Sequence, residues 1–306
     1  MALPGSAALI DARTRSRTAA WAAERGLSAE LDGLLSVFIP LADSIAERRT
    51  ATREPLLVGV SGAQGTGKST ATALLAILLE HGCDQRAALL SIDDVYLTRA
   101  ARAELARDIH PLLATRGVPG THDVALGERT LGALRSARCG DRVAMPRFDK
   151  ARDDRLAETD WPVVDGPFDV LLFEGWCVGA RPEPDAALAV PVNTLERDRD
   201  PDGSWRRYVN AQLAGPYRAL FDPIGLLIFL AAPDLESSRR WRTQQEHELA
   251  ARSIESTKVM SDEAIAQFVQ YYERISQRML QEVPHRADVV LRLDTDHRYA
   301  AIEMRG

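Results

Sequence analysis

The sequence predicts an α/β fold in which helices flank a five-stranded parallel sheet. Five short apolar runs lie at residues 56–60, 87–92, 170–173, 225–230 and 289–293. Unbroken apolar runs of this kind are typical of strands that are buried on both faces. Stretches of helical composition separate the runs, as the crossover connections of a parallel sheet require. They lie at about residues 128–137, 204–221, 235–252 and 262–280, and Ser261 is expected to cap the last. Residues 197–203 are expected to form a charged turn. A glycine-rich loop lies between the first run and the helix predicted over residues 68–80.

The first 50 residues are expected to form an N-terminal helical extension, ahead of one domain that spans residues 51–306. Within the extension, apolar residues repeat on one helical face at Leu31, Leu34, Leu35, Phe38 and Ile39. Residues 1–26 lack the apolar stretch of a secretory signal, and they contain acidic residues that transit peptides avoid. We therefore expect a cytoplasmic protein.

Composition narrows the classes of partner. The chain of 306 residues has 44 acidic and 38 basic side chains, a formal net charge of −6. This balance argues against a protein that coats nucleic acid or an anionic membrane. No apolar run reaches the ~20 residues that a membrane span needs. The three cysteines show no paired spacing, so neither a disulfide framework nor a zinc site is indicated. A small-molecule substrate remains as the expected partner.

The glycine-rich loop matches the phosphate-binding pattern G-x-x-x-x-G-K-[ST] in full. Its glycines let backbone N–H groups turn toward phosphates, and the following helix adds the positive end of its dipole. Lys68 is expected to reach the β- and γ-phosphates, and the Ser69 hydroxyl to bind Mg²⁺. The predicted nucleotide-binding residues are Gly62, Ala63, Gln64, Gly65, Thr66, Gly67, Lys68, Ser69 and Thr70.

Two acids follow predicted strands, at the edge of the sheet where ligands bind in doubly wound folds. Asp93 follows the second strand and is expected to be the general base that accepts a hydroxyl proton. Glu174 follows the third strand and is expected to position the metal, its water or the acceptor. Asp93, Glu174 and Ser69 are thus the predicted metal site. As an alternative, Asp93 or its neighbour Asp94 simply caps the next helix.

Two polar segments are predicted to bind the acceptor. In the loop 116–123, Arg116 can hold a carboxylate through two hydrogen bonds. Asp123 can accept hydrogen bonds from hydroxyls or cap the following helix, and His122 is either a substrate contact or a surface histidine. In the second segment, residues 146–150, the two cations can serve an anionic acceptor or lie in a charged turn. Tyr96, Arg147 and Lys150 complete the predicted acceptor site.

A helix predicted over residues 235–252 begins with an arginine-rich stretch. Arg239 and Arg242 are three residues apart and share a helix face. Cations that neutralise the transferring phosphoryl group are needed in a phosphoryl-transfer site, and a mobile helix can close as a lid. A solvated basic face is the alternative. Lys68, Asp93 and Glu174, with these two arginines, are the predicted catalytic residues.

Taken together and in this order, these segments resemble D-glycerate 3-kinases of the plant and fungal type and their bacterial relatives. The resemblance covers about residues 56–275 and continues through the stretches 241–246 and 260–263. The wider group resembles phosphoribulokinase, uridine kinase and pantothenate kinase. The resemblance implies a P-loop kinase fold with a five-stranded parallel core, an arginine-rich lid, and the use of ATP and Mg²⁺. It also implies that the acid at Asp93 is the base and that the acid at Asp123 touches acceptor hydroxyls. The segment after Lys150 is shorter than in the plant enzymes.

The expected function is therefore an ATP-dependent small-molecule kinase. It would transfer the γ-phosphoryl group to a hydroxyl of a small carboxylated metabolite, with D-glycerate converted to 3-phosphoglycerate as the first choice. Pantothenate or a nucleoside is the alternative acceptor. A different class, a nucleotide-driven switch that acts on a protein partner, would use the two polar segments as partner surfaces. No D-x-x-G or N-K-x-D signature of guanine-nucleotide switches supports it.

Overall fold

A parallel sheet with one antiparallel edge strand forms the centre of the molecule. The computed structural model describes residues 10–252 and 262–305. Within them, six strands form the main sheet in the order β10-β9-β8-β1-β7-β2. The parallel strands are β1 (Leu56–Gly62), β2 (Ala87–Ser91), β7 (Val170–Gly175), β8 (Leu226–Ala231) and β9 (Val289–Leu293). The predicted five-stranded parallel core is confirmed.

The sixth strand, β10 (Tyr299–Met304), pairs antiparallel with β9 and was not predicted. It lies at the edge of the sheet, where several of its residues are exposed. An edge strand of this kind lacks the unbroken apolar run that marks the central strands.

The topology reverses direction at β1. After β1 the chain forms β2 at the edge of the sheet, and β7 later inserts between β1 and β2. The next strand, β8, pairs on the other side of β1. Val58 at the middle of β1 lies level with both Leu172 and Leu226. Ligands in doubly wound folds bind beyond the carboxyl ends of the strands at such a reversal. The loop after β1 and the residue Glu174 near the end of β7 are both at this edge.

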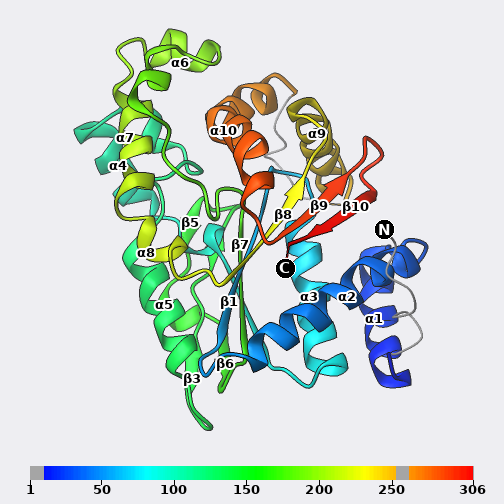
Figure 1. Ribbon diagram of the computed structural model, residues 1–306. Coiled ribbons are helices and arrows are strands. Elements are labelled where there is room, and N and C mark those ends of the chain that lie inside the picture. Colours follow the sequence, from blue (N-terminus) through cyan, green and yellow to red (C-terminus); the bar gives the residue numbers. More distant parts are fainter. Residues whose placement is uncertain (1–9, 253–261, 306) are drawn as a thin grey trace.

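Three helices cover one face of the sheet: α1 (Ala12–Arg25), α2 (Leu31–Thr50) and α3 (Lys68–Gly82). Figure 1 shows them in blue and cyan on one side of the strands. Leu74, Leu75 and Leu78 of α3 are buried against Val58 and other side chains of that face. The residues predicted to form an amphipathic helix before the first strand lie in α2, and Phe38 contacts the Tyr299 ring edge-to-face.

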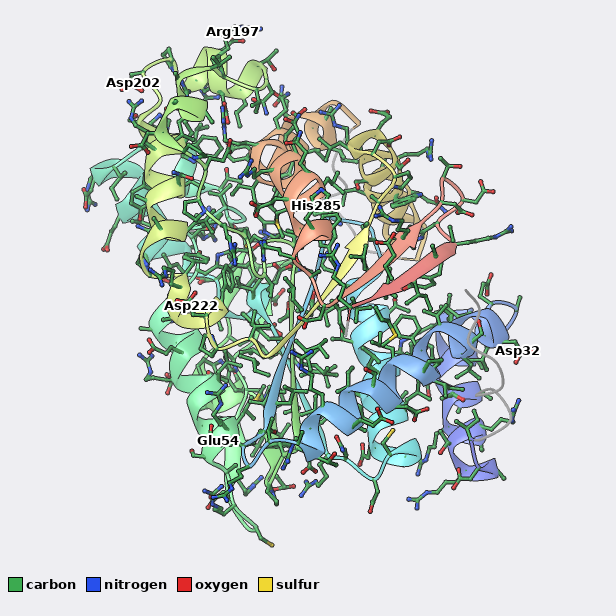
Figure 2. The ribbon with its side chains drawn as sticks, viewed as in Figure 1. Asp32, Glu54, Arg197, Asp202, Asp222 and His285 are labelled. Carbon is green, nitrogen blue, oxygen red and sulfur yellow. The ribbon has the colours of Figure 1, made fainter. Side chains whose placement is uncertain are left out.

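The opposite face is covered by α5 (Val124–Ser136), α7 (Ser204–Ala214), α8 (Arg218–Phe221) and α10 (Asp262–Glu282). The helix predicted over residues 204–221 is interrupted between α7 and α8. Pro216 explains the break, because proline has no N–H and clashes with the preceding turn of a helix. Two further helices, α4 (Arg99–Asp108) and α6 (Thr194–Arg199), were not predicted. Figure 2 shows side chains filling the space between the sheet and its helices.

The helix α9 (Leu235–Arg252) lies beside α10 beyond the carboxyl ends of the strands (Figure 1). Its bounds agree with the predicted range, whereas Ser261, expected to cap α10, lies outside the described residues. Among the described helices, none is long and apolar enough to cross a membrane. Short 3₁₀ helices lie at Ile92–Val95, Pro111–Ala114, Glu158–Asp160, Asp185–Ala189 and Val283–His285.

Two small β-ribbons lie outside the main sheet. In the first, β3 (Arg142–Ala144) pairs with β6 (Val163–Asp165). In the second, β4 (Phe148–Asp149) pairs antiparallel with β5 (Asp154–Arg155). The segment that contains Lys150 is therefore the turn of a hairpin, which we call the β4–β5 hairpin.

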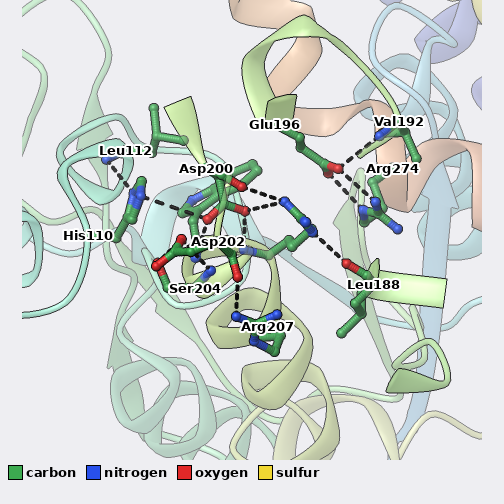
Figure 3. A network of polar contacts seen from close by, with 12 residues as sticks. His110, Leu112, Leu188, Val192, Glu196, Asp200, Asp202, Ser204, Arg207 and Arg274 are labelled. Atoms are coloured by element: carbon green, nitrogen blue, oxygen red, sulfur yellow. Dashed lines mark hydrogen bonds and ion pairs between the residues drawn. The ribbon is translucent and has the colours of Figure 1, made fainter. Parts of the chain in front are cut away.

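The α6–α7 segment, expected as a charged turn at residues 197–203, differs from that expectation. Arg197 and Asp202 do lie exposed at the far end of the molecule (Figure 2). However, Glu196 and Asp200 are buried, and each forms an ion pair with an arginine (Figure 3). These two buried ion pairs hold the segment in place, although a charged stretch of sequence is usually exposed to solvent.

Candidate active site

The phosphate loop has the backbone shape that its sequence pattern predicts. Gly67 has a left-handed backbone (φ 85°) and forms the N-cap of α3. A Cβ atom at Gly62 would lie 2.6 Å from the carbonyl oxygen of Leu230, so no larger residue fits there. The Lys68 ammonium donates to the carbonyl oxygen of Ala63, 3.0 Å away across the loop. The loop thus places a lysine and the N-terminus of a long helix around one small space, which suits phosphate groups.

Ser69 and Glu174 lie together beside this loop. The Ser69 hydroxyl donates to Glu174 Oε1 at 3.3 Å. Burial raises the pKa of Glu174, and the charge of Lys68 opposes that rise. Burial likewise lowers the pKa of Lys68, against the attraction of Glu174 and Asp93. These mutual effects indicate that Lys68, Glu174 and Asp93 share one site.

Asp93 lies in the 3₁₀ turn after β2. Its backbone N–H is capped by the Ser91 hydroxyl at 3.3 Å, and its own carboxylate accepts a hydrogen bond from Lys150 Nζ at 2.8 Å. Burial would raise the pKa of Asp93, but Lys150, His122 and the Tyr96 hydroxyl outweigh it and hold that pKa below its usual value. Asp93 is therefore ionised near neutral pH, as a base must be. Its carboxylate caps no helix, and neither does that of Asp94, which pairs with Arg147 at 2.5 Å.

The β4–β5 hairpin joins the acids of the site through ion pairs. Lys150 pairs with Asp93, and Arg155 pairs with Asp123 at 2.9 Å. Arg116, from the predicted acceptor loop, pairs with Asp153 of the hairpin and lies over the Phe148 ring. The residues predicted to bind an acceptor are thus brought together, although their charges neutralise one another.

The acceptor loop itself is buried. Asp123 caps α5, the alternative expected for it, by accepting from Leu126 N at 3.0 Å, and it also pairs with Arg155. His122 is not a surface histidine, because only 4% of it is exposed. Its ring stacks on Tyr96, with centroids 4.3 Å apart, and its Nδ1 lies 2.5 Å from the Tyr217 hydroxyl. Burial lowers the pKa of His122 to about 3, so the ring is neutral.

The two lid arginines of α9 lie beside the phosphate loop. Arg239 and Arg242 line a pocket together with Ala63 and Gln64. Arg239 also donates to Glu273 of α10 at 2.9 Å. The helix contacts the loop closely, since a Cβ atom at Gly65 would lie 2.9 Å from Trp241 Cβ. The alternative of a solvated basic face does not fit these contacts.

Several residues of the site were not predicted. Arg155 and Asp153 follow Lys150 in a stretch of alternating charge, which was a usable signal. Tyr217 and Tyr272 carried none, because aromatic residues on amphipathic helices are usually core. The Tyr272 hydroxyl donates to the carbonyl oxygen of Arg116 at 3.2 Å and lines the same pocket as Arg239.

The donor set suits a hard cation that also binds phosphate. Among residues 10–252 and 262–305, no group of three or more His, Cys, Asp or Glu side chains could hold a metal by itself. Mg²⁺ is usually bound by one or two carboxylates and a substrate's phosphates, with water completing its shell. Ser69 and Glu174, with Asp93 nearby, fit that pattern.

Comparison with known proteins decides the family. An uncharacterized kinase of Schizosaccharomyces pombe is 36% identical over 225 residues, which cover 71% of this chain and 78% of that protein. The chloroplastic D-glycerate 3-kinase of Arabidopsis thaliana is 34% identical over 78% of this chain. The structure of D-glycerate 3-kinase from Cryptococcus neoformans superposes with a TM-score of 0.72 at 28% identity, over 87% of this chain and 97% of the other. The chain belongs to the D-glycerate 3-kinase family.

Membership of the D-glycerate 3-kinase family confirms the predicted fold, that of a P-loop kinase, and the predicted reaction class, phosphoryl transfer to a hydroxyl. The chain spans about half the length of the Arabidopsis enzyme (52%). No known family model matches the chain.

Proposed function

We propose that this protein transfers the γ-phosphoryl group of ATP to the 3-hydroxyl of D-glycerate, with Mg²⁺ as cofactor. The observation that carries the proposal is the position of Asp93. It lies beside Lys68 and Glu174 of the nucleotide site and is paired with Lys150 of the β4–β5 hairpin. A base with a phosphate loop on one side and cations on the other suits an acceptor with both a hydroxyl and a carboxylate. The named activity of the Arabidopsis and Cryptococcus relatives supports the choice of glycerate.

The proposed mechanism divides the work among three groups. Asp93 accepts the proton of the attacking hydroxyl, a role that its ionised state supports. Lys68, Arg239 and Arg242 neutralise the charge that spreads over the transferring oxygens. Ser69 and Glu174 would hold Mg²⁺, which would supply positive charge that neutralises the phosphates.

The acceptor is proposed to bind by exchange of ion-pair partners. Arg116, Arg147 and Lys150 each have an aspartate partner in the structure. A carboxylate of the substrate can take the place of such an aspartate beside its cation, and the displaced aspartate then loses that partner. Asp123, Tyr96 and His122 would then contact the hydroxyls.

Two further features belong to the proposal. Residues 1–50 are an extension whose helices cover one face of a kinase domain that spans residues 51–306. The location is cytoplasmic, which agrees with the free state of Cys83, Cys139 and Cys177, whereas the Arabidopsis relative is described as chloroplastic.

A panel of acceptors tests the proposal. Purified protein is incubated with ATP, Mg²⁺ and D-glycerate, pantothenate, uridine or ribulose 5-phosphate, and ADP release is measured. We expect consumption of ATP only with D-glycerate, and 3-phosphoglycerate as the product by mass spectrometry. If only another compound of the panel is phosphorylated, that compound and not glycerate is the acceptor. ATP hydrolysis that no acceptor accelerates would favour a nucleotide switch.

A further inference from the structure

The buried pair His122 and Tyr217 contains one hydrogen-bonding group that has no partner. Nδ1 of His122 lies 2.5 Å from the Tyr217 hydroxyl, whereas Nε2 is shielded from solvent and has no partner among the described residues. Tyr217 is fully buried between α7 and α8. An unpaired buried polar group costs about 1–3 kcal/mol, so its presence in a folded protein calls for an explanation.

The hydrogen bonds of Tyr217 determine which ring nitrogen carries the proton. The backbone N–H of Gly120 donates to the Tyr217 oxygen at 2.9 Å. The oxygen therefore acts as an acceptor there, and its own hydrogen is left to donate to Nδ1 of His122. The neutral ring must then carry its proton on Nε2. The opposite assignment would leave two groups unpaired, the tyrosine hydrogen and the Nε2 lone pair, instead of one.

The free Nε2–H group belongs to the acceptor side of the site. The two ring nitrogens point in diverging directions, so Nε2 points away from the Tyr217 hydroxyl that contacts Nδ1. Tyr96 covers one face of the ring, and the charge of Asp93 acts on the imidazole. Phe148 of the β4–β5 hairpin packs edge-to-face on Tyr96. Nε2 is shielded from solvent, so we infer that the hairpin moves when the acceptor binds. Its pair between Lys150 and Asp93 is partly exposed and so costs little to open, whereas the buried Arg102 also pairs with Asp153 of the hairpin.

We propose that His122 presents its Nε2–H as a fixed, neutral donor to an oxygen of the acceptor, and that Tyr217 is the positioning residue that keeps the ring in this tautomer. The inference rests on the proposed function, because the acceptor oxygen is that of a small hydroxy acid. Because Nε2–H can only donate, the site would select substrates that place a hydrogen-bond-accepting oxygen at this position. A cation such as an ammonium group would be rejected there, since it has no lone pair to accept the bond.

Two substitutions of His122 separate the roles of its two nitrogens. His122→Gln places an amide near the position of Nε2, and His122→Asn places one near Nδ1. We expect H122N to raise the KM for D-glycerate by roughly ten- to a hundredfold, because a buried oxygen of the substrate loses its donor. H122Q should recover much of this loss, and the KM for ATP should stay the same in both. Equal acceptor KM values for H122N and H122Q, or for H122N and the wild type, would overturn the proposal.

The tautomer is measured directly, without any assay of activity. Two-bond ¹H–¹⁵N correlation spectra of the ¹⁵N-histidine-labelled protein distinguish a protonated Nε2 from a protonated Nδ1. The chain has six histidines, so the signals of His122 are identified by their loss in H122N. We expect the Nε2–H form in the wild type, a mixture of tautomers in Tyr217→Phe, and a change in the Nε2 signal when D-glycerate is added.

These spectra keep the two proposals distinguishable. If the wild type phosphorylates a different acceptor, glycerate is wrong as substrate, and the same spectra with the true acceptor still test His122. A wild-type ring protonated on Nδ1, or a Nε2 signal that no substrate of the enzyme changes, would refute the role of the pair even if glycerate is phosphorylated.

Discussion

The ion pair between Glu196 and Arg274 lets the stability of the α6–α7 segment be predicted from geometry. Arg274 Nε and Nη2 each donate to one oxygen of Glu196 at 2.7 Å, and Glu196 is 1% exposed (Figure 3). In Arg274→Met the Glu196 carboxylate stays buried and keeps only the backbone N–H of Val192 at 3.0 Å. Breaking a buried pair from one side costs about 3–5 kcal/mol. For a chain of 306 residues, that corresponds to a fall in Tm of about 5–8 °C.

Thermal unfolding followed by circular dichroism measures this fall, with an exposed pair as the matched control. Arg218 and Asp222 pair one helical turn apart with both side chains well exposed, so Arg218→Met should cost under about 1 kcal/mol. The double variant E196Q/R274M should recover part of the loss, because the buried charge of Glu196 is removed and only Glu183, among the described residues, loses an ion pair with Arg274. Equal Tm values for R274M and R218M, or a double variant less stable than the sum of its parts, would refute the reasoning.

Three more predictions concern the site. In the glycerate assay, Lys68→Ala should lower kcat about 10²–10³-fold, and Asp93→Asn should lower it about 10²–10⁴-fold. The circular dichroism of both variants should stay unchanged. Near-normal turnover in D93N would show that Asp93 is not the base. Gly65→Ala should raise the KM for ATP at least about tenfold. A side chain strains the left-handed backbone of this residue (φ 81°), and its Cβ would collide with Trp241. Gly132→Ala is the control, because a Cβ atom there meets nothing within 4 Å. The pKa of about 3 for His122 means that only the unfolded chain gains a proton on this histidine as the pH falls below 6.5. Stability should therefore decrease by about 2 kcal/mol from pH 6.5 to 5; urea unfolding should show that this part of the slope is absent in H122N.

The central sheet and the phosphate loop could be predicted because their physical requirements are local. Strands buried on both faces need unbroken apolar runs, and a loop that wraps phosphates needs glycines at set positions such as Gly62 and Gly67. The acids Asp93 and Glu174 could be placed as well, since parallel strands bring their carboxyl ends to one edge.

The remaining features depend on contacts between distant parts of the chain. Glu196 and Asp200 lie in a charged stretch, and nothing nearby in the sequence reveals the arginines that allow their burial. The β4–β5 hairpin has strands too short for an alternating pattern, and it is held by ion pairs with residues from three other segments. Tyr217 falls on an apolar helix face, where the role of a single hydroxyl cannot be read from periodicity.

The pairing of cations with acids around the acceptor site also bears on how a substrate arrives. Lys150, Arg147 and Arg155 each have an aspartate partner, so these ion pairs leave little excess charge to attract an anion from the solvent. Long-range attraction depends on such an excess and disappears in salt. An anionic acceptor would then find the site by ordinary diffusion, and its association rate would change little with ionic strength. Selectivity for an anion would arise only at contact, when the hairpin opens and the carboxylate takes the place of an aspartate.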